Sequence, residues 1–312
     1  MSGLALVFPG QGSQQVGMGR AIAEEFAEAR EVFDVADRKL GFSLSRLCFE
    51  GPAEELKLTE NTQPAILTTS VALYRVLARQ GIEPDFVAGH SLGEYSALVA
   101  AGCLRLEDAV GLVRNRGRYM QEAVPVGEGA MAAILGLGSA EVEAVCKEAA
   151  EGQVVEAANL NAPGQTVIAG HAVAVERASA KAKERGAKRV ISLPVSAPFH
   201  CRLMKPAEKR LQQDFSGVGF SDLRMPLISN VDAAPVRTGA EAMDALIRQV
   251  SSPVRWEESV RHLVAQGVDQ FVEVGPGKVL SGLVRKVTDG ARVVSVEDPS
   301  GVGKLLAEVA DA

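Results

Sequence analysis

Hydrophobic residues in the first part of the chain form two kinds of pattern. Two short apolar runs, residues 4–8 and 86–88, each stop at a turn that contains glycine, which is typical of buried strands. Between and after these runs the apolar positions recur at helical spacing. This spacing predicts helices over residues 20–40, 62–80, 91–101 and 106–123. Strands alternating with helices predict an α/β fold with a mostly parallel sheet.

The pattern changes after Pro125, where strand-like and helix-like segments follow in the order β-α-β-β-α-β. This order is typical of a ferredoxin-like unit. The segments are predicted over residues 130–135, 139–150, 154–158, 166–169, 172–185 and 189–193, with a turn at residues 161–164 between the two middle strands.

Helix–strand alternation returns from His200 onward and includes a strong strand over residues 270–274. The small unit is therefore expected to be inserted into the large one. We predict a ferredoxin-like domain at residues 127–197, inserted into an α/β domain made of residues 1–126 and 198–312.

Composition and charge exclude several classes of protein. The chain has 312 residues, of which 47% are hydrophobic and 23% charged, and its formal net charge is −6, so neither nucleic acid nor an anionic membrane is an expected partner. No apolar stretch reaches the roughly 18 residues of a membrane span, and no basic segment precedes the first apolar run. The four cysteines are widely spaced, which argues against a metal site or disulfides and predicts a cytoplasmic protein.

Residues 89–93, Gly-His-Ser-Leu-Gly, match the G-x-S-x-G nucleophile elbow. A strand must turn sharply into a helix there, and the small residues allow the turn without a clash. Ser91 would then stand at the helix N-terminus as a nucleophile, while Glu94 in the first turn is expected to compensate the helix dipole. The alternative is a structural turn without chemistry.

A nucleophilic serine needs a base, and His200 has the most suitable position of the four histidines. It lies where the inserted segment returns the chain to the large domain, and such junctions line interdomain clefts. His90, His171 and His262 have no comparable position. Cys201 next to His200 is interpreted as a buried structural thiol.

Several motifs together resemble the malonyl-CoA:acyl-carrier-protein transacylases, the acyltransferase family of fatty acid and polyketide synthesis. They cover nearly the whole chain in the order of that family. The motifs lie at residues 9–14, 89–94, 116–121, 159–163, 198–200 and 273–277.

The resemblance implies a hydrolase-like large domain and a role for each matching residue. Ser91 would carry the malonyl ester and His200 would act as its base. The family has no triad carboxylate, and the backbone carbonyl of Gln249 matches the group that orients the histidine. The amides of Gln11 and Leu92 match the oxyanion hole, although Gln11 taken alone could be an ordinary turn residue.

The resemblance also implies which residues bind the acyl group. Arg116 would grip the malonyl carboxylate with two parallel hydrogen bonds. Composition cannot choose between Arg116 and its neighbours Arg114 and Arg118, but only Arg116 shares a helical face with Met120. The remaining matches to the pocket are Met120, Asn159, Asn161, Phe199 and Gln63, of which Phe199 would crowd a branched acyl chain and Gln63 could instead cap a helix.

The implied reaction is a ping-pong transfer of malonyl from malonyl-CoA to the thiol of acyl carrier protein, by a monomer and without a metal or other cofactor. Three alternatives stay open: a serine thioesterase or hydrolase, a free-standing acyltransferase of polyketide synthesis, and a non-catalytic acyl-binding protein. Two basic faces could dock the carrier protein or coenzyme A, and the alternative is that they are ordinary solvated surfaces. They consist of Arg202, Lys205 and Lys209, and of Arg185, Lys188 and Arg189.

Overall fold

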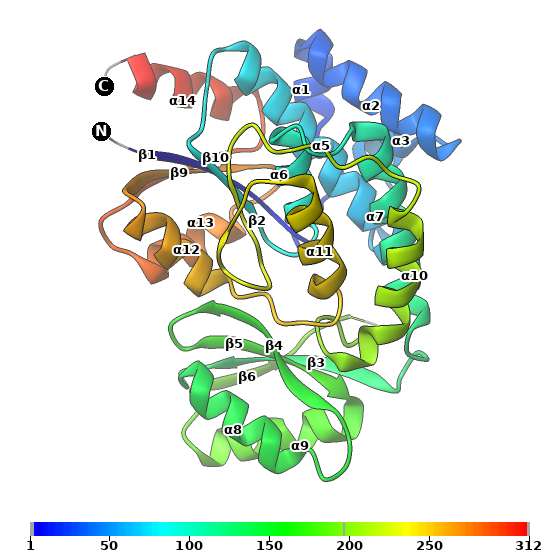
Figure 1. Ribbon diagram of the computed structural model, residues 1–312, viewed down its shortest axis with the longest axis vertical. Coiled ribbons are helices and arrows are strands. Elements are labelled where there is room, and N and C mark those ends of the chain that lie inside the picture. The colour runs from blue at the N-terminus through cyan, green and yellow to red at the C-terminus, as the bar shows by residue number, and fades with distance from the viewer. Residues whose placement is uncertain (1–2, 196, 311–312) are drawn as a thin grey trace.

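A mostly parallel sheet forms the centre of the larger domain (Figure 1). The computed structural model describes residues 3–195 and 197–310. Within these residues the sheet has six strands, ordered β10 (Arg292–Val296), β9 (Val268–Val274), β1 (Gly3–Phe8), β2 (Phe86–Gly89), β7 (Leu227–Ile228) and β8 (Pro235–Val236). Every neighbouring pair is parallel except β7 and β8. The predicted α/β class with a mostly parallel sheet is confirmed.

Side chains of β1 alternate between two apolar cores, because successive residues of a strand point to opposite faces. Ala5 and Val7 face one core, which they share with α12 (Trp256–Ala265) and α13 (Val279–Val287). Leu6 and Phe8 face the other core. Its helices are α1 (Arg20–Glu25), α2 (Ala27–Leu40), α3 (Leu44–Glu50), α4 (Ala53–Leu56), α5 (Thr59–Arg79), α6 (Gly93–Ala100), α7 (Leu106–Glu122), α10 (Lys205–Phe215), α11 (Gly239–Gln249), α14 (Pro299–Ala310) and the short 3₁₀ helix η1 (Arg202–Met204).

Figure 1 shows α12 and α13 on the side of the sheet away from α5 and α7, so the sheet is covered on both faces. A parallel sheet needs this cover because its strands are apolar on both sides. Within the described ranges, no helix has both the length and the hydropathy that crossing a membrane requires.

The single helix predicted over residues 20–40 is wrong. The chain breaks at Phe26, whose backbone is extended, into α1 and α2. The guanidinium of Arg30 donates to the carbonyls of Ala23 (3.0 Å) and Glu24 (3.1 Å), which satisfies the end of α1. Apolar spacing continues through the break, so periodicity alone could not locate it.

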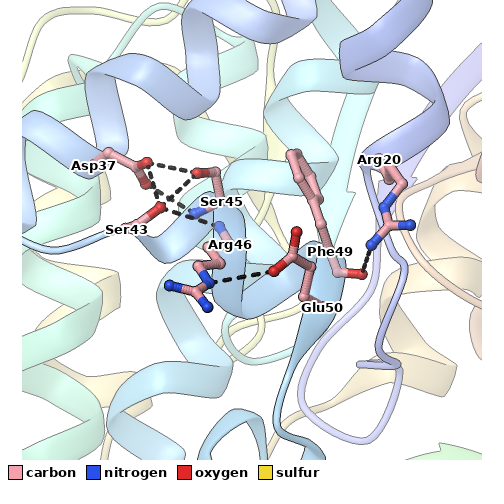
Figure 2. Close-up of polar contacts among 7 residues, drawn as sticks. All are labelled: Arg20, Asp37, Ser43, Ser45, Arg46, Phe49 and Glu50. Atoms are coloured by element: carbon pink, nitrogen blue, oxygen red, sulfur yellow. Dashed lines mark hydrogen bonds and ion pairs between the residues drawn. The ribbon is translucent and has the colours of Figure 1, made fainter.

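A cluster of polar contacts ties α1, α2 and α3 together (Figure 2). Asp37 on α2 accepts hydrogen bonds from the backbone N–H of Ser45 (2.8 Å) and from the hydroxyls of Ser45 (2.6 Å) and Ser43 (3.2 Å). Arg20 at the start of α1 donates to the carbonyl of Phe49 at 2.5 Å. These bonds join the three helices as one layer, whose buried side chains belong to the same core as those of α5.

The small domain is a four-stranded antiparallel sheet with two helices on one face, seen at the bottom of Figure 1. In the described residues its elements are β3 (Gly129–Leu135), α8 (Ser139–Ala149), β4 (Val155–Ala162), β5 (Gln165–His171), α9 (Ala172–Glu184) and β6 (Arg189–Ser192). The strand order β4-β5-β3-β6 is the ferredoxin-like order. These elements lie inside the predicted insertion, whose bounds at 127 and 197 stay predictions; residue 196 lies outside the described residues.

The turn predicted at residues 161–164 is shorter in the structure. Strand β4 continues to Ala162 and β5 begins at Gln165, so only Pro163 and Gly164 connect them. Gly164 supplies the positive φ of 69° that closes so tight a hairpin. Asn159 and Asn161 therefore lie in a strand of the small domain rather than at a loop tip.

Backbone hydrogen bonds join the two domains along β4. The N–H of Leu160 donates to the carbonyl of Val254, and the N–H of Val254 donates to the carbonyl of Ala158, both at 2.9 Å. Val254 follows α11 closely in the large domain and forms a parallel bridge with Asn159. The segment after α11 thus extends the sheet of the small domain, and this fixes β4 beside the large domain.

Glycines allow β1, β2 and α6 to cross closely. A Cβ on Gly93 would lie 2.0 Å from the carbonyl oxygen of Phe8, and a Cβ on Gly89 would lie 2.0 Å from the backbone of Gly93. Both distances are far below van der Waals contact. The first turn of α6 can approach the end of β1 only because both positions are glycine.

We expect Gly93→Ala to lower the free energy of unfolding by about 3 kcal/mol, since the methyl group must push α6 away from β1. Urea unfolding measures the change. Gly282→Ala is the matched control, because Gly282 also lies in a helix and a Cβ there has no heavy atom of the described residues within 4 Å. The control should be neutral or stabilise by up to about 1 kcal/mol; equal stabilities of the two variants would contradict the explanation.

Candidate active site

Ser91 occupies a strained turn between β2 and α6. Its φ of 52° lies in the left-handed region, which non-glycine residues seldom adopt. Two buried carboxamides hold this backbone. The N–H of Ser91 donates to Asn230 Oδ1 (2.7 Å), Asn230 Nδ2 donates to the carbonyl of Gly89 (2.6 Å), and Gln249 Nε2 donates to the carbonyl of Ser91 (2.9 Å). The strain is thus offset by hydrogen bonds from elements far away in the sequence.

His200 meets Ser91 from the other end of the inserted domain. The Ser91 hydroxyl lies 2.6 Å from His200 Nε2, and His200 Nδ1 lies 3.0 Å from the backbone carbonyl of Gln249. A carbonyl can only accept, so the proton of the neutral ring is on Nδ1 and Nε2 accepts from the hydroxyl. This is the arrangement of a nucleophile and its general base.

The imidazole of His200 is held in its neutral form. Burial, and to a lesser extent the positive charge of Arg116, lower its pKa from 6.5 to about 3. Above that pH the ring can accept a proton at Nε2. Among the residues that the structure describes, no carboxylate contacts Nδ1, where the carbonyl of Gln249 is the partner.

Arg116 on α7 is 1% exposed and points at the nucleophile. Its Nη2 donates to Ser91 Oγ (3.1 Å) and to Gln249 Oε1 (2.9 Å), and its Nη1 donates to Gln63 Oε1 (2.9 Å). The guanidinium also lies 5.5 Å from the centre of the Tyr95 ring. Hydrogen bonds therefore hold the positive charge of Arg116 next to Ser91 and close enough to His200 to affect its pKa.

The neighbouring arginines point elsewhere. Arg114 donates to Asn61 and stacks over Phe42 at 4.7 Å, whereas Arg118 lies over the ring of Tyr119. Of the three arginines of α7 between residues 114 and 118, Arg116 alone lines the cavity at Ser91. The helical face, rather than the residue type, decides which one can bind a ligand.

A cavity of about 120 Å³ opens over Ser91 between the two domains. Nine of the predicted site residues line it: Gln11, Gln63, Ser91, Leu92, Arg116, Met120, Asn159, Phe199 and His200. Gln249 and Asn161 do not line the cavity. Gln249 instead forms hydrogen bonds to the lining residues Ser91, Arg116 and His200. Asn161 Oδ1 is 2.8 Å from Nε2 of His90, which does line the cavity.

Two amides at the cavity are suited to an oxyanion. Among the described residues, the backbone N–H groups of Gln11 and Leu92 have no hydrogen-bond acceptor. Leu92 precedes the first turn of α6, where the helix dipole adds a partial positive charge. Both residues line the cavity with Ser91, so the two donors are available to a negative oxygen formed there.

Gln63 lies in the second turn of α5, so the alternative of a helix cap is wrong. It is 2% exposed, its oxygen accepts from Arg116, and its Nε2 lies 3.9 Å from Met120 Sδ. Cys201 is fully buried, and burial raises the pKa of its thiol to about 12. The thiol donates to the carbonyl of Pro198 and is not a nucleophile at neutral pH.

The sequence did not identify six residues of the site. One is His90, which had no position comparable to that of His200 and yet lines the cavity. Met131, Leu193 and Val195 of the inserted segment line the cavity, but single apolar residues carry no signal of a pocket. Asn230 follows the two-residue strand β7, which is too short for its pattern to be recognised. Glu94 does lie in the first turn of α6 as expected, yet it is fully buried and hydrogen-bonded.

The two predicted basic faces are partly neutralised. Arg202 pairs with Glu156 at 2.8 Å, and Lys205 pairs with Glu208 at 2.8 Å. On the small domain, Arg185 pairs with an acid of α8. Their role in docking stays a prediction.

Comparison with known proteins identifies the family. The model of the acyl transferase domain matches residues 5–311. The chain belongs to the acyl transferase family. This acyl transferase is 54% identical to the malonyl CoA-acyl carrier protein transacylase of Bacillus subtilis over 303 residues, which are 97% of this chain and 96% of the relative.

Solved structures agree with this family. An acyl carrier protein S-malonyltransferase from Vibrio cholerae is 48% identical, with a TM-score of 0.96 over 97% of this acyl transferase and all of that chain. A malonyl-transacylase solved in complex with its type II PKS acyl-carrier protein is 45% identical, with a TM-score of 0.96 over 98% and 100% of the two chains. The resemblance noted in the motifs is confirmed over nearly the whole length.

We expect His200 to stay neutral from pH 8 down to about pH 5, because its pKa is lowered to about 3. ¹⁵N-histidine NMR should show a protonated Nδ1 and an unprotonated Nε2 throughout this range. The His200→Ala variant identifies the signals by their loss. A titration midpoint between pH 6 and 7 for these signals would contradict the effect of burial and of Arg116.

Proposed function

We propose that this acyl transferase moves a malonyl group from malonyl-CoA to the phosphopantetheine thiol of acyl carrier protein in fatty acid biosynthesis, through a malonyl ester of Ser91. The observation that carries the proposal is that the guanidinium of Arg116 lies 3.1 Å from Ser91 Oγ. His200 forms a hydrogen bond with the same oxygen atom. A guanidinium beside the nucleophile suits an acyl group that ends in a carboxylate. The names of the relatives give the same donor and acceptor.

In the first half-reaction, the Ser91 hydroxyl attacks the thioester carbonyl of malonyl-CoA and gives its proton to His200 Nε2. The amides of Gln11 and Leu92 stabilise the oxyanion of the tetrahedral intermediate. When this intermediate collapses, the C–S bond breaks and the leaving thiolate takes the proton from His200. Malonyl-Ser91 and free coenzyme A result.

The second half-reaction runs in reverse with another thiol. The phosphopantetheine thiol of the carrier protein gives its proton to His200, and its sulfur attacks the ester carbonyl. The ester C–O bond breaks and Ser91 regains the proton from His200. Because a thioester replaces a thioester, the two directions have similar free energies.

The other lining residues give the pocket its shape in this proposal. Met120 and Phe199 form apolar walls that favour an unbranched acyl chain, and Asn159 offers a polar group to the substrate. Asn161 acts indirectly, through its contact with His90 at 2.8 Å. Gln249 orients His200 through its backbone carbonyl.

The proposed chemistry needs only proton transfers and a serine ester, so no metal or other cofactor takes part. We further propose a monomer in the cytoplasm that binds neither membrane nor nucleic acid. The net charge of −6 supports the last point. The four cysteines, all buried and unpaired, fit a reducing compartment.

A free-standing role in polyketide synthesis uses the same residues, and the similarity to a malonyl-transacylase in complex with a type II PKS carrier protein keeps it as a second candidate. Transfer rates with carrier proteins of both kinds separate the two roles. A serine hydrolase is less well supported, since the carbonyl of Gln249 stands where a triad carboxylate would orient the histidine.

Intact-mass spectrometry after mixing with malonyl-CoA should detect one malonyl group on the protein, and none on Ser91→Ala. His200→Ala should slow acylation by about 100-fold or more, because the serine loses its base. Cys201→Ala is the control and should keep the adduct. An adduct that persists in Ser91→Ala would disprove the assigned nucleophile, and lack of any adduct on the unchanged protein would favour a non-catalytic acyl-binding role.

Arg116→Ala should reduce the preference for malonyl-CoA over acetyl-CoA by about 10–100-fold, because one charge-assisted contact is worth about 1.5–3 kcal/mol. The ratio of the two kcat/KM values measures it. Arg116→Lys should recover part of the preference, as lysine keeps the charge without the planar fork. Arg114→Ala, whose side chain points away from the cavity, should leave the ratio unchanged; an equal loss in Arg114→Ala would argue against direct recognition by Arg116.

A further inference from the structure

Glu94 is a fully buried carboxyl group directly behind the nucleophile. Its Oε2 accepts from the side-chain Nε2 of Gln249 at 2.6 Å and from the backbone N–H of Asn230 at 3.2 Å. Its Oε1 is buried without a hydrogen-bond partner among the described residues. The proposed reaction gives this group no role, although a buried carboxyl group is costly unless a partner compensates it.

Both partners of Glu94 are the residues that hold the site together. Gln249 Nε2 and Asn230 Oδ1 bind the backbone of Ser91 from its two sides. Gln249 Oε1 also accepts from Arg116 at 2.9 Å, and the Gln249 backbone carbonyl orients His200. Glu94 is therefore linked indirectly to Ser91, His200 and Arg116, with only Asn230 or Gln249 between.

The charges around Glu94 make it a counter-charge for Arg116. Within the described residues Arg116 forms no ion pair, and the carboxyl group of Glu94 reaches it through one carboxamide. Two other titratable groups face Glu94: Tyr95 on its own helix, and Asp232 after β7, which is paired with Arg248. Arg116 is thus the positive charge to which Glu94 responds.

We propose that Glu94 is a positioning residue whose carboxylate balances Arg116 before the substrate binds, and that Glu94 takes up one proton from solvent when the acyl carboxylate reaches Arg116. One negative charge is then near Arg116 at each stage: that of Glu94 before the substrate binds, and that of the acyl carboxylate afterwards. The inference rests on the proposed function, because it requires Arg116 to bind the carboxylate of the acyl group.

The direction of the exchange follows from the electrostatics. Burial raises the pKa of Glu94 to about 7, against the hydrogen bonds from Gln249 and Asn230 and the positive charge of Arg116, which lower it. A substrate carboxylate on Arg116 cancels that positive charge, so the pKa of Glu94 rises further. Above pH 7, malonyl-CoA binding should therefore be coupled to proton uptake, and its affinity should fall as the pH increases.

Calorimetry of the Ser91→Ala variant tests the uptake, since this variant binds malonyl-CoA without acylation. The apparent binding enthalpies at pH 8 in phosphate and in Tris differ by the number of protons bound multiplied by the difference between the ionisation enthalpies of the two buffers. We expect net uptake of a substantial fraction of one proton with malonyl-CoA and none with acetyl-CoA, which lacks the carboxylate. Equal uptake with both ligands would overturn the proposal, because the proton would then belong to the coenzyme A site.

Glu94→Gln in the same background removes the charge but can keep the contacts. Its amide oxygen replaces Oε2 as the acceptor of both hydrogen bonds, and its NH₂ group takes the place of the unpartnered Oε1. Proton uptake should disappear in the double variant. Uptake that persists there assigns the proton to another group and overturns the proposal.

Steady-state kinetics gives an independent reading with Ser91 intact. The kcat/KM for malonyl-CoA should fall by up to tenfold per pH unit above about 7 in the unchanged enzyme and stay level in Glu94→Gln. A Glu94→Gln variant that loses activity equally at every pH would indicate a merely structural carboxyl group. Thermal unfolding establishes that the variant is folded.

The binding and proton-uptake measurements also distinguish a failure of this inference from a failure of the proposed function. If Ser91→Ala binds malonyl-CoA no better than acetyl-CoA, Arg116 does not recognise the carboxylate and both ideas fail. If malonyl-CoA is preferred but no proton is taken up, the role of Arg116 stands and only the assignment of Glu94 is wrong.

Discussion

A buried guanidinium beside the nucleophile is the constraint on which the rest of the site depends. Arg116 is 1% exposed, and a cation so far from water is costly unless hydrogen bonds compensate it. Gln63, Gln249 and Ser91 accept from its two Nη groups, and each comes from a different part of the large domain. Its Nε has no hydrogen-bond partner among the described residues. The packing of α5, α7 and α11 around the end of the sheet therefore also assembles the surroundings of this guanidinium.

The positive charge of Arg116 also affects the base, His200. Burial and this charge together lower the pKa of His200 and keep its ring neutral, and a backbone carbonyl is then a sufficient partner for Nδ1. A carboxylate at that position would stabilise the imidazolium more strongly, but it would also compete for the guanidinium. The use of Gln249 as a neutral orienter is consistent with a site in which the substrate brings its own negative charge.

The sequence predicted the outline of the fold and the reacting pair, because those features have local signatures. The elbow at Ser91 follows from two glycines between an apolar strand and a helix. Arg116 was instead indicated by the family resemblance, with support from the helical face it shares with Met120. The break at Phe26 was missed since the guanidinium of Arg30 stabilises it from outside the local pattern. Asn230 and the burial of Glu94 were missed for a related reason: their contacts join residues more than 130 positions apart.

The backbone bonds between β4 and Val254 have a consequence for how substrates reach the site. They join the two domains beside Asn159, which lines the cavity, so the small domain cannot move away at this point without breaking two backbone hydrogen bonds. A cavity of about 120 Å³ over Ser91 suits the end of a slender, flexible chain with a sulfur at its tip. Coenzyme A and a carrier protein share such an arm while differing in everything beyond it. A small site between two joined domains therefore suits either arm in turn, while the rest of each carrier stays outside.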